Sequence, residues 1–379
     1  MAACGLEDRP VRIRVAPKVD AGVMDQTQQL ATPAGAGLLI SVVLATYHRA
    51  ETLRRTLRHL AEQDLHASQY EVIVIDDGSP DDTGAVVASM RTEMACALTY
   101  LRHDNHGPGY TQNRGIKAAR AALVLLLADD IFLSVQALRA HAEHHRAHPA
   151  PQVVVMGKIL QSPDLDQSVF LRKWDPFRFI EVDDQDTLPI CRFGAPNVSA
   201  KRDFLLSHGP FLEHRGRAGA AAFEDVELGY RLHSHGMRLL YSKAALGYHH
   251  HVSTLDQAVN RWYERGLNYG EFRRHARHPE LSVYFHVLNR DTVREYLGVL
   301  CGPNPFRGLE GSIAWHLFRN ACRIVTLNGF TTRWVWRPVF DYAERWPLLA
   351  ALVKPKMYRA YLYYHFLRGV NHGRSRYGA

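Results

Sequence analysis

Residues 38–77 read LLISVVLATYHRAETLRRTLRHLAEQDLHASQYEVIVIDD, and this stretch decides the fold class. Two short apolar runs, 38–45 and 70–75, have the pattern of strands buried on both faces, and each run ends in polar residues. The segment 51–63 between them places leucines at helical spacing, with arginines on the opposite face. This order of strand, helix and strand predicts a parallel α/β sheet.

The same pattern continues along the chain. Further strands are predicted at 98–102 and 123–128, with a glycine-rich turn and a helix-like segment between them. Ligands of parallel α/β sheets bind beyond the carboxyl ends of the strands, so polar clusters at three of these ends predict one shared crevice. The clusters are Thr46 with Tyr47, Asp76 with Asp77, and Asp129 with Asp130.

Length and charge divide the chain into three parts. Residues 1–36 show no periodicity and are predicted to form a flexible tail, 37–251 hold the α/β pattern, and 252–379 are predicted to be helical. The whole chain has a formal net charge of +8. The last part contains 19 Lys and Arg against 9 Asp and Glu, a net charge of +10, which leaves −2 for the rest. The excess positive charge therefore belongs to the C-terminal part.

Several protein classes are excluded by composition and motifs. No run of about 18 apolar residues is present, so an integral membrane protein is not expected. The five cysteines are scattered without a C-x-x-C pair, which argues against a disulfide framework or a cysteine zinc site. No P-loop, dinucleotide fingerprint or nucleic-acid-binding signature occurs, so no nucleic-acid partner is expected. The first residues lack the layout of a secretory signal, which favours the cytoplasm.

Two groups of residues carry candidate chemistry. Carboxylates at neighbouring strand ends suit Mg²⁺ or Mn²⁺, although Asp is also common wherever a strand stops. The triplet His249-His250-His251 offers imidazole ligands, of which at most two can face one site because neighbours in an extended segment point in opposite directions. Glu224 and Asp225 begin a predicted helix, whose dipole would keep Asp225 ionised, as a general base requires.

Two other groups of residues are predicted to have structural or peripheral roles. One is a histidine series predicted on the solvated face of a polar helix, namely His141, His144, His145 and His148. The other is a set of aromatic residues among the C-terminal arginines, which would form either a belt on an anionic membrane or the core of packed helices. This set contains Trp262, Tyr263, Trp334, Trp336, Tyr361, Tyr363 and Tyr364.

Seven segments between residues 38 and 251 together resemble the family 2 glycosyltransferases of the GT-A fold. They are SVVLATYHRAETLRRTL, YEVIVIDDGSPDDT, HDNHGPGYTQNRGI, LVLLLADDIFL, GAPNVSAKRDFLLSHGPFLE, AFEDVELGYRL and the histidine triplet. Each segment alone is weak, but the ordered set is specific. The resemblance implies a GT-A nucleotide-diphospho-sugar transferase fold with a mainly parallel central sheet and a C-terminal helical extension.

The resemblance also implies an activity. Family members transfer a sugar, with inversion, from a nucleotide-diphosphate sugar to an acceptor hydroxyl, using Mn²⁺ or Mg²⁺. For this chain, the resemblance points first to a UDP-sugar as the donor. The acceptor would be a glycan, a lipid-linked molecule or a small molecule. Asp225 matches the general base, with Glu224 as its fallback, and Asp130 and His249 match the metal ligands. The residues expected near the acceptor are Gly194 and Asn197. The residues expected to bind the nucleotide sugar are Thr46, Tyr47, Arg49, Asp76, Asp77, Gly78, Asn113, Asp129 and Asp130.

Two departures from the family pattern leave alternatives open. Ala128 stands where the metal motif usually begins with Asp, and Gln112 stands where an arginine is frequent near the diphosphate. A sugar-nucleotide nucleotidyltransferase or a catalytically decayed binding protein therefore remain as alternatives. A lipid-linked acceptor would suit a peripheral position at the inner face of the membrane. The sequence determines neither the sugar nor the oligomeric state.

Overall fold

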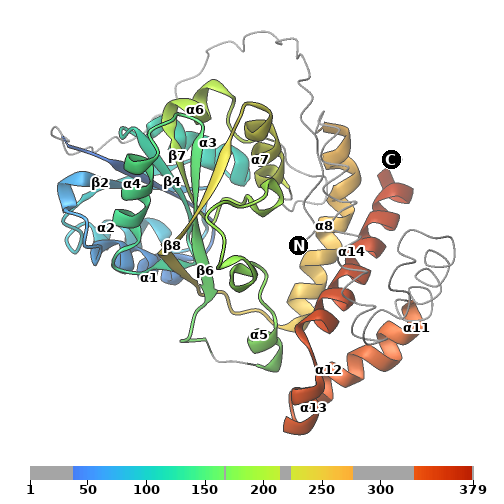
Figure 1. The fold of residues 1–379 in the computed structure, drawn as a ribbon. Coiled ribbons are helices and arrows are strands. Elements are labelled where there is room, and N and C mark those ends of the chain that lie inside the picture. Colours follow the sequence, from blue (N-terminus) through green and yellow to red (C-terminus); the bar gives the residue numbers. More distant parts are fainter. Residues whose placement is uncertain (1–36, 166–167, 214–222, 276–327, 378–379) are drawn as a thin grey trace.

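The computed structural model describes residues 37–165, 168–213, 223–275 and 328–377. The predicted tail, 1–36, lies outside these residues. One eight-stranded sheet forms the centre, in the order β3-β2-β1-β4-β7-β6-β8-β5, with helices packed around it (Figure 1). The strands are β1 (Ile40–Thr46), β2 (Tyr70–Asp76), β3 (Ala97–Arg102), β4 (Leu123–Ala128), β5 (Ile131–Leu133), β6 (Val153–Gln161), β7 (Asn197–Lys201) and β8 (Arg238–His249).

The helices fall into a group around the sheet and a C-terminal group. The first group is α1 (Ala50–Ala61), α2 (Thr83–Met90), α3 (Pro108–Ala118), α4 (Ala137–Ala147), α5 (Val169–Lys173), α6 (Arg202–Ser207) and α7 (Glu224–Ser234), with short 3₁₀ turns at Ala67–Gln69, Phe179–Val182 and Ile190–Arg192. The second group is α8 (Leu255–His275), α11 (Gly329–Thr331), the π-helical turn η4 (Thr332–Trp336), α12 (Arg337–Ala343), α13 (Pro347–Leu352) and α14 (Pro355–Tyr377).

The four strands predicted from the sequence are confirmed within two residues at each end. β1 pairs in parallel with β2 and β4, and β2 pairs in parallel with β3. Beyond β4 the sheet is mixed, because β7 runs antiparallel to β4 and β6, and β5 runs antiparallel to β8. The α/β sheet followed by C-terminal helices is the fold class that the sequence predicts.

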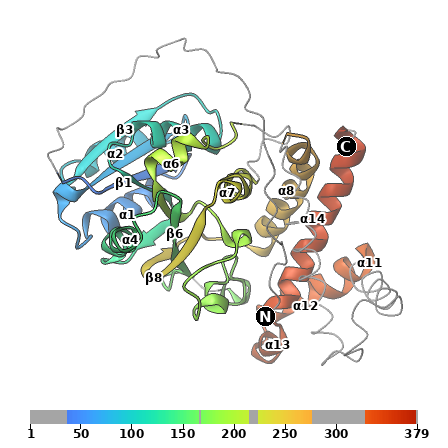
Figure 2. The same cartoon turned by 45° about the horizontal axis from the view of Figure 1, so that its top comes forward.

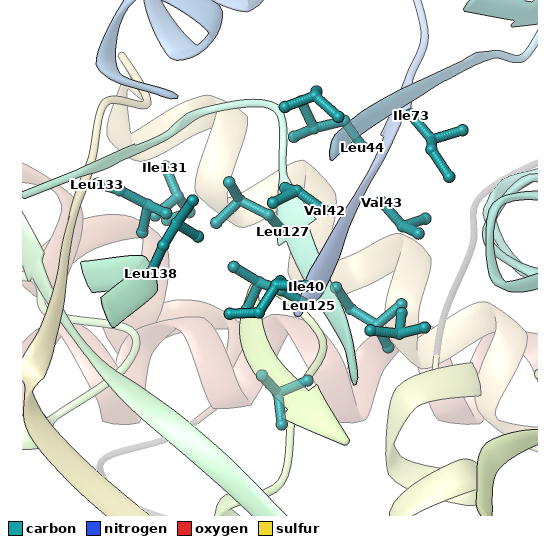
Figure 3. Packing of buried hydrophobic residues seen from close by; sticks show 14 of the residues in the cluster. Ile40, Val42, Val43, Leu44, Ile73, Leu125, Leu127, Ile131, Leu133 and Leu138 are labelled. Atoms are coloured by element: carbon teal, nitrogen blue, oxygen red, sulfur yellow. The ribbon is translucent and has the colours of Figure 1, made fainter. Parts of the chain in front are cut away.

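Apolar side chains from adjacent strands form the main core. Every residue of β2 is buried, as expected for a strand covered on both faces. Figure 3 shows side chains of β1 and β4 packed beside Ile131, Leu133 and Leu138. On α3, a Cβ added to Gly115 would lie 2.3 Å from Val43 Cγ1, so glycine lets this helix approach the sheet closely. The core thus holds the strands at the register that places their carboxyl ends together.

The C-terminal helices pack against the sheet domain through α5 and α7. In Figures 1 and 2, α8 and α14 lie side by side, and α7 lies between them and the sheet. Phe223 and Val226 at the start of α7 share a buried cluster with Tyr363 and Phe366 of α14. Within the described ranges, no helix combines the length and apolar character needed to span a bilayer.

The predictions for the C-terminal aromatic residues and for the histidines of α4 have mixed outcomes. Of the C-terminal aromatic set, Tyr361 and Tyr363 are buried, whereas Trp334 is 61% exposed. The prediction that the α4 histidines are solvated is wrong for His141 and His145, which are buried. Each ring has one nitrogen within hydrogen-bond distance of the Ser199 hydroxyl on β7, and the other nitrogens have Asn197 and Lys201 as partners. Because burial disfavours the charged imidazole, it lowers the pKa of His141 to about 4 and, with the Lys201 charge, that of His145 to about 3. 

Candidate active site

The polar ends of β1, β2 and β4 meet at one edge of the sheet, as the sequence predicts. Thr46 lies opposite Asp76 in the parallel register, and Ala45 lies opposite Ala128. The Thr46 hydroxyl donates a hydrogen bond to Asp129 Oδ2 over 2.7 Å. The side chains that follow three strands therefore form a single group.

Arg49 joins the two carboxylates that follow β4. Its Nη1 lies 3.0 Å from Asp129 Oδ1 and 2.7 Å from Asp130 Oδ2. Burial raises the pKa of Asp129 to about 6, with the Arg49 charge opposing this rise and the Asp130 charge adding to it. Burial also acts to raise the pKa of Asp130, but the nearby imidazoles of His249 and His251 and the charge of Arg49 hold this pKa well below the usual range. Asp130 therefore stays ionised to a lower pH than Asp129 does.

Asp76 is buried at the end of β2, and its oxygens are bonded within the protein. Oδ2 accepts from the Tyr100 hydroxyl over 2.5 Å, and Oδ1 accepts from the Ser79 backbone N–H over 2.7 Å. Tyr47, in contrast, is 48% exposed at the same edge. The nucleoside-binding role of both residues stays a prediction.

Asp77 connects the end of β2 to the start of α3. It accepts hydrogen bonds from the backbone N–H groups of His106, over 2.7 Å, and Gly107, over 2.9 Å. Gly78 has φ +78°, and an added Cβ would lie 2.9 Å from the backbone nitrogen of Asn105. A side chain at residue 78 would therefore be strained, which explains the glycine.

A possible metal site is formed by Asp130 and two histidines. His249 lies opposite Ile131 in the β5–β8 pairing, which brings the end of β8 next to the residue that precedes β5. Asp130 Oδ2 is 3.6 Å from His249 Nε2 and 3.2 Å from His251 Nδ1. One ligand atom from each of the three residues lies within 4.8 Å of the others. A carboxylate with two imidazoles is a donor set that suits Mn²⁺ and related ions.

His250 faces away from this group. Its ring stacks on Phe132, and its Nε2 lies 2.7 Å from Arg55 Nη1. The alternation expected for an extended segment therefore places His249 and His251 on one side. Only His249 was predicted from the sequence to bind the metal, although the same alternation points to His251 as well.

The start of α7 places two further carboxyl groups in a pocket of about 360 Å³. Glu224 and Asp225 line it together with Gln112 of α3, and an added Cβ at Gly194 would lie 3.7 Å from Asp225 Oδ2. Asp225 Oδ1 accepts from the Val226 backbone N–H over 2.8 Å. Gln112 Oε1 and Glu224 Oε1 are both buried, and neither has a hydrogen-bond partner among the described residues. Two orphaned acceptors in one pocket indicate a ligand with hydroxyl donors.

The two α7 carboxyl groups have raised pKa values. Burial raises the pKa of Glu224 to about 7, and the Asp225 charge adds to the rise. Burial also raises the pKa of Asp225, against the attraction of Arg265. The prediction that the helix dipole keeps Asp225 ionised is therefore incomplete, because burial acts in the opposite direction. A raised pKa suits a group that must take up a proton near neutral pH.

The raised pKa of Glu224 predicts a pH-dependent effect on stability. Its ordinary value is 4.5, so the stability that the neutral carboxyl contributes is complete below pH 4.5 and is lost as the pH rises through about 7. Glu224→Gln should therefore raise the free energy of unfolding by about 2 kcal/mol at pH 8.5 and change it little at pH 5. Denaturant unfolding at the two pH values measures this difference. Glu143→Gln, at an exposed site on α4, is the control, and an equal effect of Glu224→Gln at both pH values would contradict the prediction.

Two arginines of α8, which were not predicted from the sequence, also line the pocket of Glu224 and Asp225. Arg261 donates to His251 Nε2 over 2.6 Å, and the Arg265 guanidinium lies 5.2 Å from the centre of the Phe223 ring. Both line the pocket that contains Asp225. The C-terminal part therefore supplies positive charge to the site.

Two asparagines of the predicted site form hydrogen bonds within the protein. The Asn113 amide bonds both backbone groups of Phe211, accepting over 2.8 Å and donating over 2.9 Å. Asn197 is fully buried, donates to the Ala245 carbonyl over 2.9 Å, and lies 3.0 Å from His141 Nε2. The structure does not bring the Asn197 side chain into the pocket, whereas it does bring Gly194 beside Asp225.

Residues 41–197 match the model of glycosyl transferase family 2. This match agrees with the family resemblance that the sequence indicates. Curated relatives include the validoxylamine A glucosyltransferase of Streptomyces hygroscopicus subsp. jinggangensis, 29% identical over 66% of this chain and 64% of the relative. The poly(ribitol-phosphate) beta-N-acetylglucosaminyltransferase TarS of Staphylococcus aureus is 28% identical over 34% of this chain and 23% of the relative. The chain thus matches less than two thirds of either relative.

Solved structures with a similar backbone include the mannosyltransferase PcManGT from Pyrobaculum calidifontis in complex with GDP-Man and Mn²⁺. It is 17% identical, with a TM-score of 0.49 over 82% of this chain and 86% of that one. Residues 1–349 of S. aureus TarS in complex with UDP are 17% identical, with a TM-score of 0.44 over 90% of this chain and 92% of that one.

Proposed function

We propose that the protein transfers a sugar, with inversion, from a nucleotide-diphosphate sugar to an acceptor hydroxyl. One observation carries this proposal: the half-buried carboxyl group of Asp225 shares a pocket with two acceptors that have no partner among the described residues, and Arg261 of α8 links that pocket to the Asp130–His249–His251 group. The match to a glycosyl transferase family favours transfer over the nucleotidyltransferase alternative. A UDP-sugar is the first donor to test.

The residues would divide the reaction between them. Asp225 would take the proton from the acceptor hydroxyl as its oxygen attacks the anomeric carbon. Gln112 and Glu224 would accept hydrogen bonds from sugar hydroxyls and so orient the sugar. Arg261 and Arg265 would hold positive charge near the departing diphosphate. Each role uses a group that the pocket already contains.

Asp130, His249 and His251 would hold a divalent metal ion. Their donor atoms fit Mn²⁺, and His249 and His251 would compensate for the absence of a carboxylate at Ala128. The bound ion would supply positive charge against the leaving diphosphate. Arg49 is bonded to Asp130 and would help to fix the position of that carboxylate.

Binding of UDP should therefore depend on the metal. We expect UDP to bind at least about ten-fold more tightly with Mn²⁺ than with a chelator, and Asp130→Asn to remove this gain, because the amide has lost the charge that attracts the ion. Isothermal titration calorimetry measures both affinities. Asp203→Asn is the matched control, since Asp203 is an exposed carboxylate on α6. Equal UDP affinity of the unmutated protein with and without Mn²⁺ would count against the metal role.

The sugar transfer itself is tested with a panel of UDP-, GDP- and dTDP-sugars and Mn²⁺. The product anomer, read by NMR from the anomeric coupling, should be opposite to that of the donor. A retained anomer would overturn the inverting mechanism. Donor turnover absent from the whole panel would favour the alternative of a decayed binding protein.

A further inference from the structure

A second pocket, of about 260 Å³, lies beside the candidate metal group. His249 and His251 form part of its wall, and α5, the loop after α5, α8 and α14 supply much of the rest. Its volume is on the scale of one sugar unit. Its aromatic lining residues are Trp174, Phe223, Trp262 and Phe366, and its arginines are Arg178, Arg261, Arg265 and Arg359.

The charge of this pocket is strongly one-sided. Four guanidinium groups line it, and Asp175 is the one carboxylate among its lining residues in the described part of the chain. Positive groups gathered along one partly enclosed space attract an anionic ligand. Guanidinium groups also pair bidentately with carboxylate and phosphate oxygens. The pocket is therefore suited to a ligand that carries one of these groups.

The aromatic rings give the pocket apolar walls. The Trp174 and Trp262 rings meet edge to face with their centres 6.0 Å apart, and the Trp262 and Phe366 centres are 6.3 Å apart in the same arrangement. Such rings offer rigid apolar surface to the carbon-bound hydrogens of a sugar or polyol, while nearby polar groups orient the ligand. Walls of this kind favour a carbohydrate that bears the anion over a free inorganic ion.

The pocket adjoins the pocket of the proposed base. Phe223, Arg261 and Arg265 line both of them. A ligand seated here is therefore adjacent to Asp225, the group that would receive the acceptor's proton. This position favours the acceptor as the occupant.

We propose that this pocket binds the acceptor, and that the acceptor is a sugar or polyol carrying a carboxylate or a phosphate. This inference rests on the proposed function and extends it to the class of acceptor. The C-terminal arginines then have a role in the choice of substrate.

The test compares neutral and anionic probes of equal ring size. Glucose, glucose 6-phosphate and glucuronate are titrated into the full chain by ligand-observed NMR, with Mn²⁺ and with or without UDP. We expect the two anionic probes to bind at least ten-fold more tightly than glucose, with an affinity that falls as salt is added.

Arg359→Gln identifies the pocket as the binding site. Arg359 lines this pocket and not the pocket of Asp225. The variant should weaken glucose 6-phosphate binding about ten-fold and leave UDP binding unchanged, and Arg359→Lys should restore part of the loss. Arg146→Gln, at an exposed arginine of α4, is the control for the loss of one positive charge and should have no effect.

Three outcomes would overturn the proposal. The first is equal affinity for glucose and glucose 6-phosphate, and the second is an unchanged affinity of Arg359→Gln for glucose 6-phosphate. The third is competition between UDP and glucose 6-phosphate, which would assign the pocket to the donor. Probe binding that persists although no nucleotide binds would support the pocket and would count against the proposed function. Failure of the acceptor proposal can thus be distinguished from failure of the proposed function.

Discussion

Asp225→Asn is expected to lower the transfer rate by about 10³-fold while UDP affinity in the presence of Mn²⁺ changes less than two-fold. The amide has nearly the same shape as the carboxylate, and its oxygen can still accept the Val226 N–H hydrogen bond. It cannot accept a proton from the acceptor hydroxyl, so the loss should fall on the chemical step. Initial rates at saturating donor and calorimetric UDP binding measure the two quantities separately.

Two variants in the same pocket make this result specific. Glu264→Gln removes an exposed carboxylate from the pocket lining and should change the rate less than three-fold. Glu224→Gln removes the neighbouring acidic residue, and a larger loss there than in Asp225→Asn would transfer the base role to Glu224. Near-normal turnover by Asp225→Asn would exclude Asp225 as the base.

The transfer rate of the unmutated enzyme should also depend on pH through the ionisation of Asp225. Burial raises the pKa of Asp225, so the carboxylate becomes protonated at a higher pH than an exposed aspartate does. Transfer needs the ionised form, and the rate should therefore fall on the acid side, at a pH above the usual aspartate range. This acid limb should be absent from the residual rate of Asp225→Asn.

The first half of the sheet could be predicted from the sequence because its signals are local. The runs 38–45, 70–75, 98–102 and 123–128 are short and apolar, and turn residues follow them, so length and composition alone indicate buried strands. The antiparallel insertion of β7 between β4 and β6 depends on pairing between distant segments. No local pattern reports such pairing.

Site residues with a local sequence signal were predicted, whereas those that depend on contacts between distant segments were missed. Asp130 and Asp225 stand in segments with recognisable order, whereas Arg261 and Arg265 reach the site only because α8 packs beside α7. His145 was assigned to solvent because its helix looks polar. Its ring is satisfied by the Ser199 hydroxyl of β7, a partner 54 residues away in the chain.

Gly369→Leu is expected to lower the free energy of unfolding by about 3 kcal/mol. The helices α8 and α14 approach so closely that a Cβ at Gly369 would lie 2.0 Å from the Tyr263 carbonyl oxygen, and one at Gly266 would lie 2.1 Å from the Phe366 carbonyl oxygen. Both obstacles are backbone atoms, which cannot move without separating the helices. Thermal or denaturant unfolding monitored by circular dichroism measures the loss.

The sign of this effect distinguishes packing from helix propensity. In an isolated helix, replacing glycine by leucine would stabilise by roughly 0.5–1 kcal/mol, so a loss can come only from the contact with α8. Arg368→Leu places the same side chain on the exposed face one residue earlier and should change stability little. Because α8 also carries Arg261 and Arg265, Gly369→Leu should reduce transfer even though residue 369 lines neither pocket. A stabilised Gly369→Leu variant with full activity would show that the close helix contact is not needed, and that the C-terminal arginines act without it.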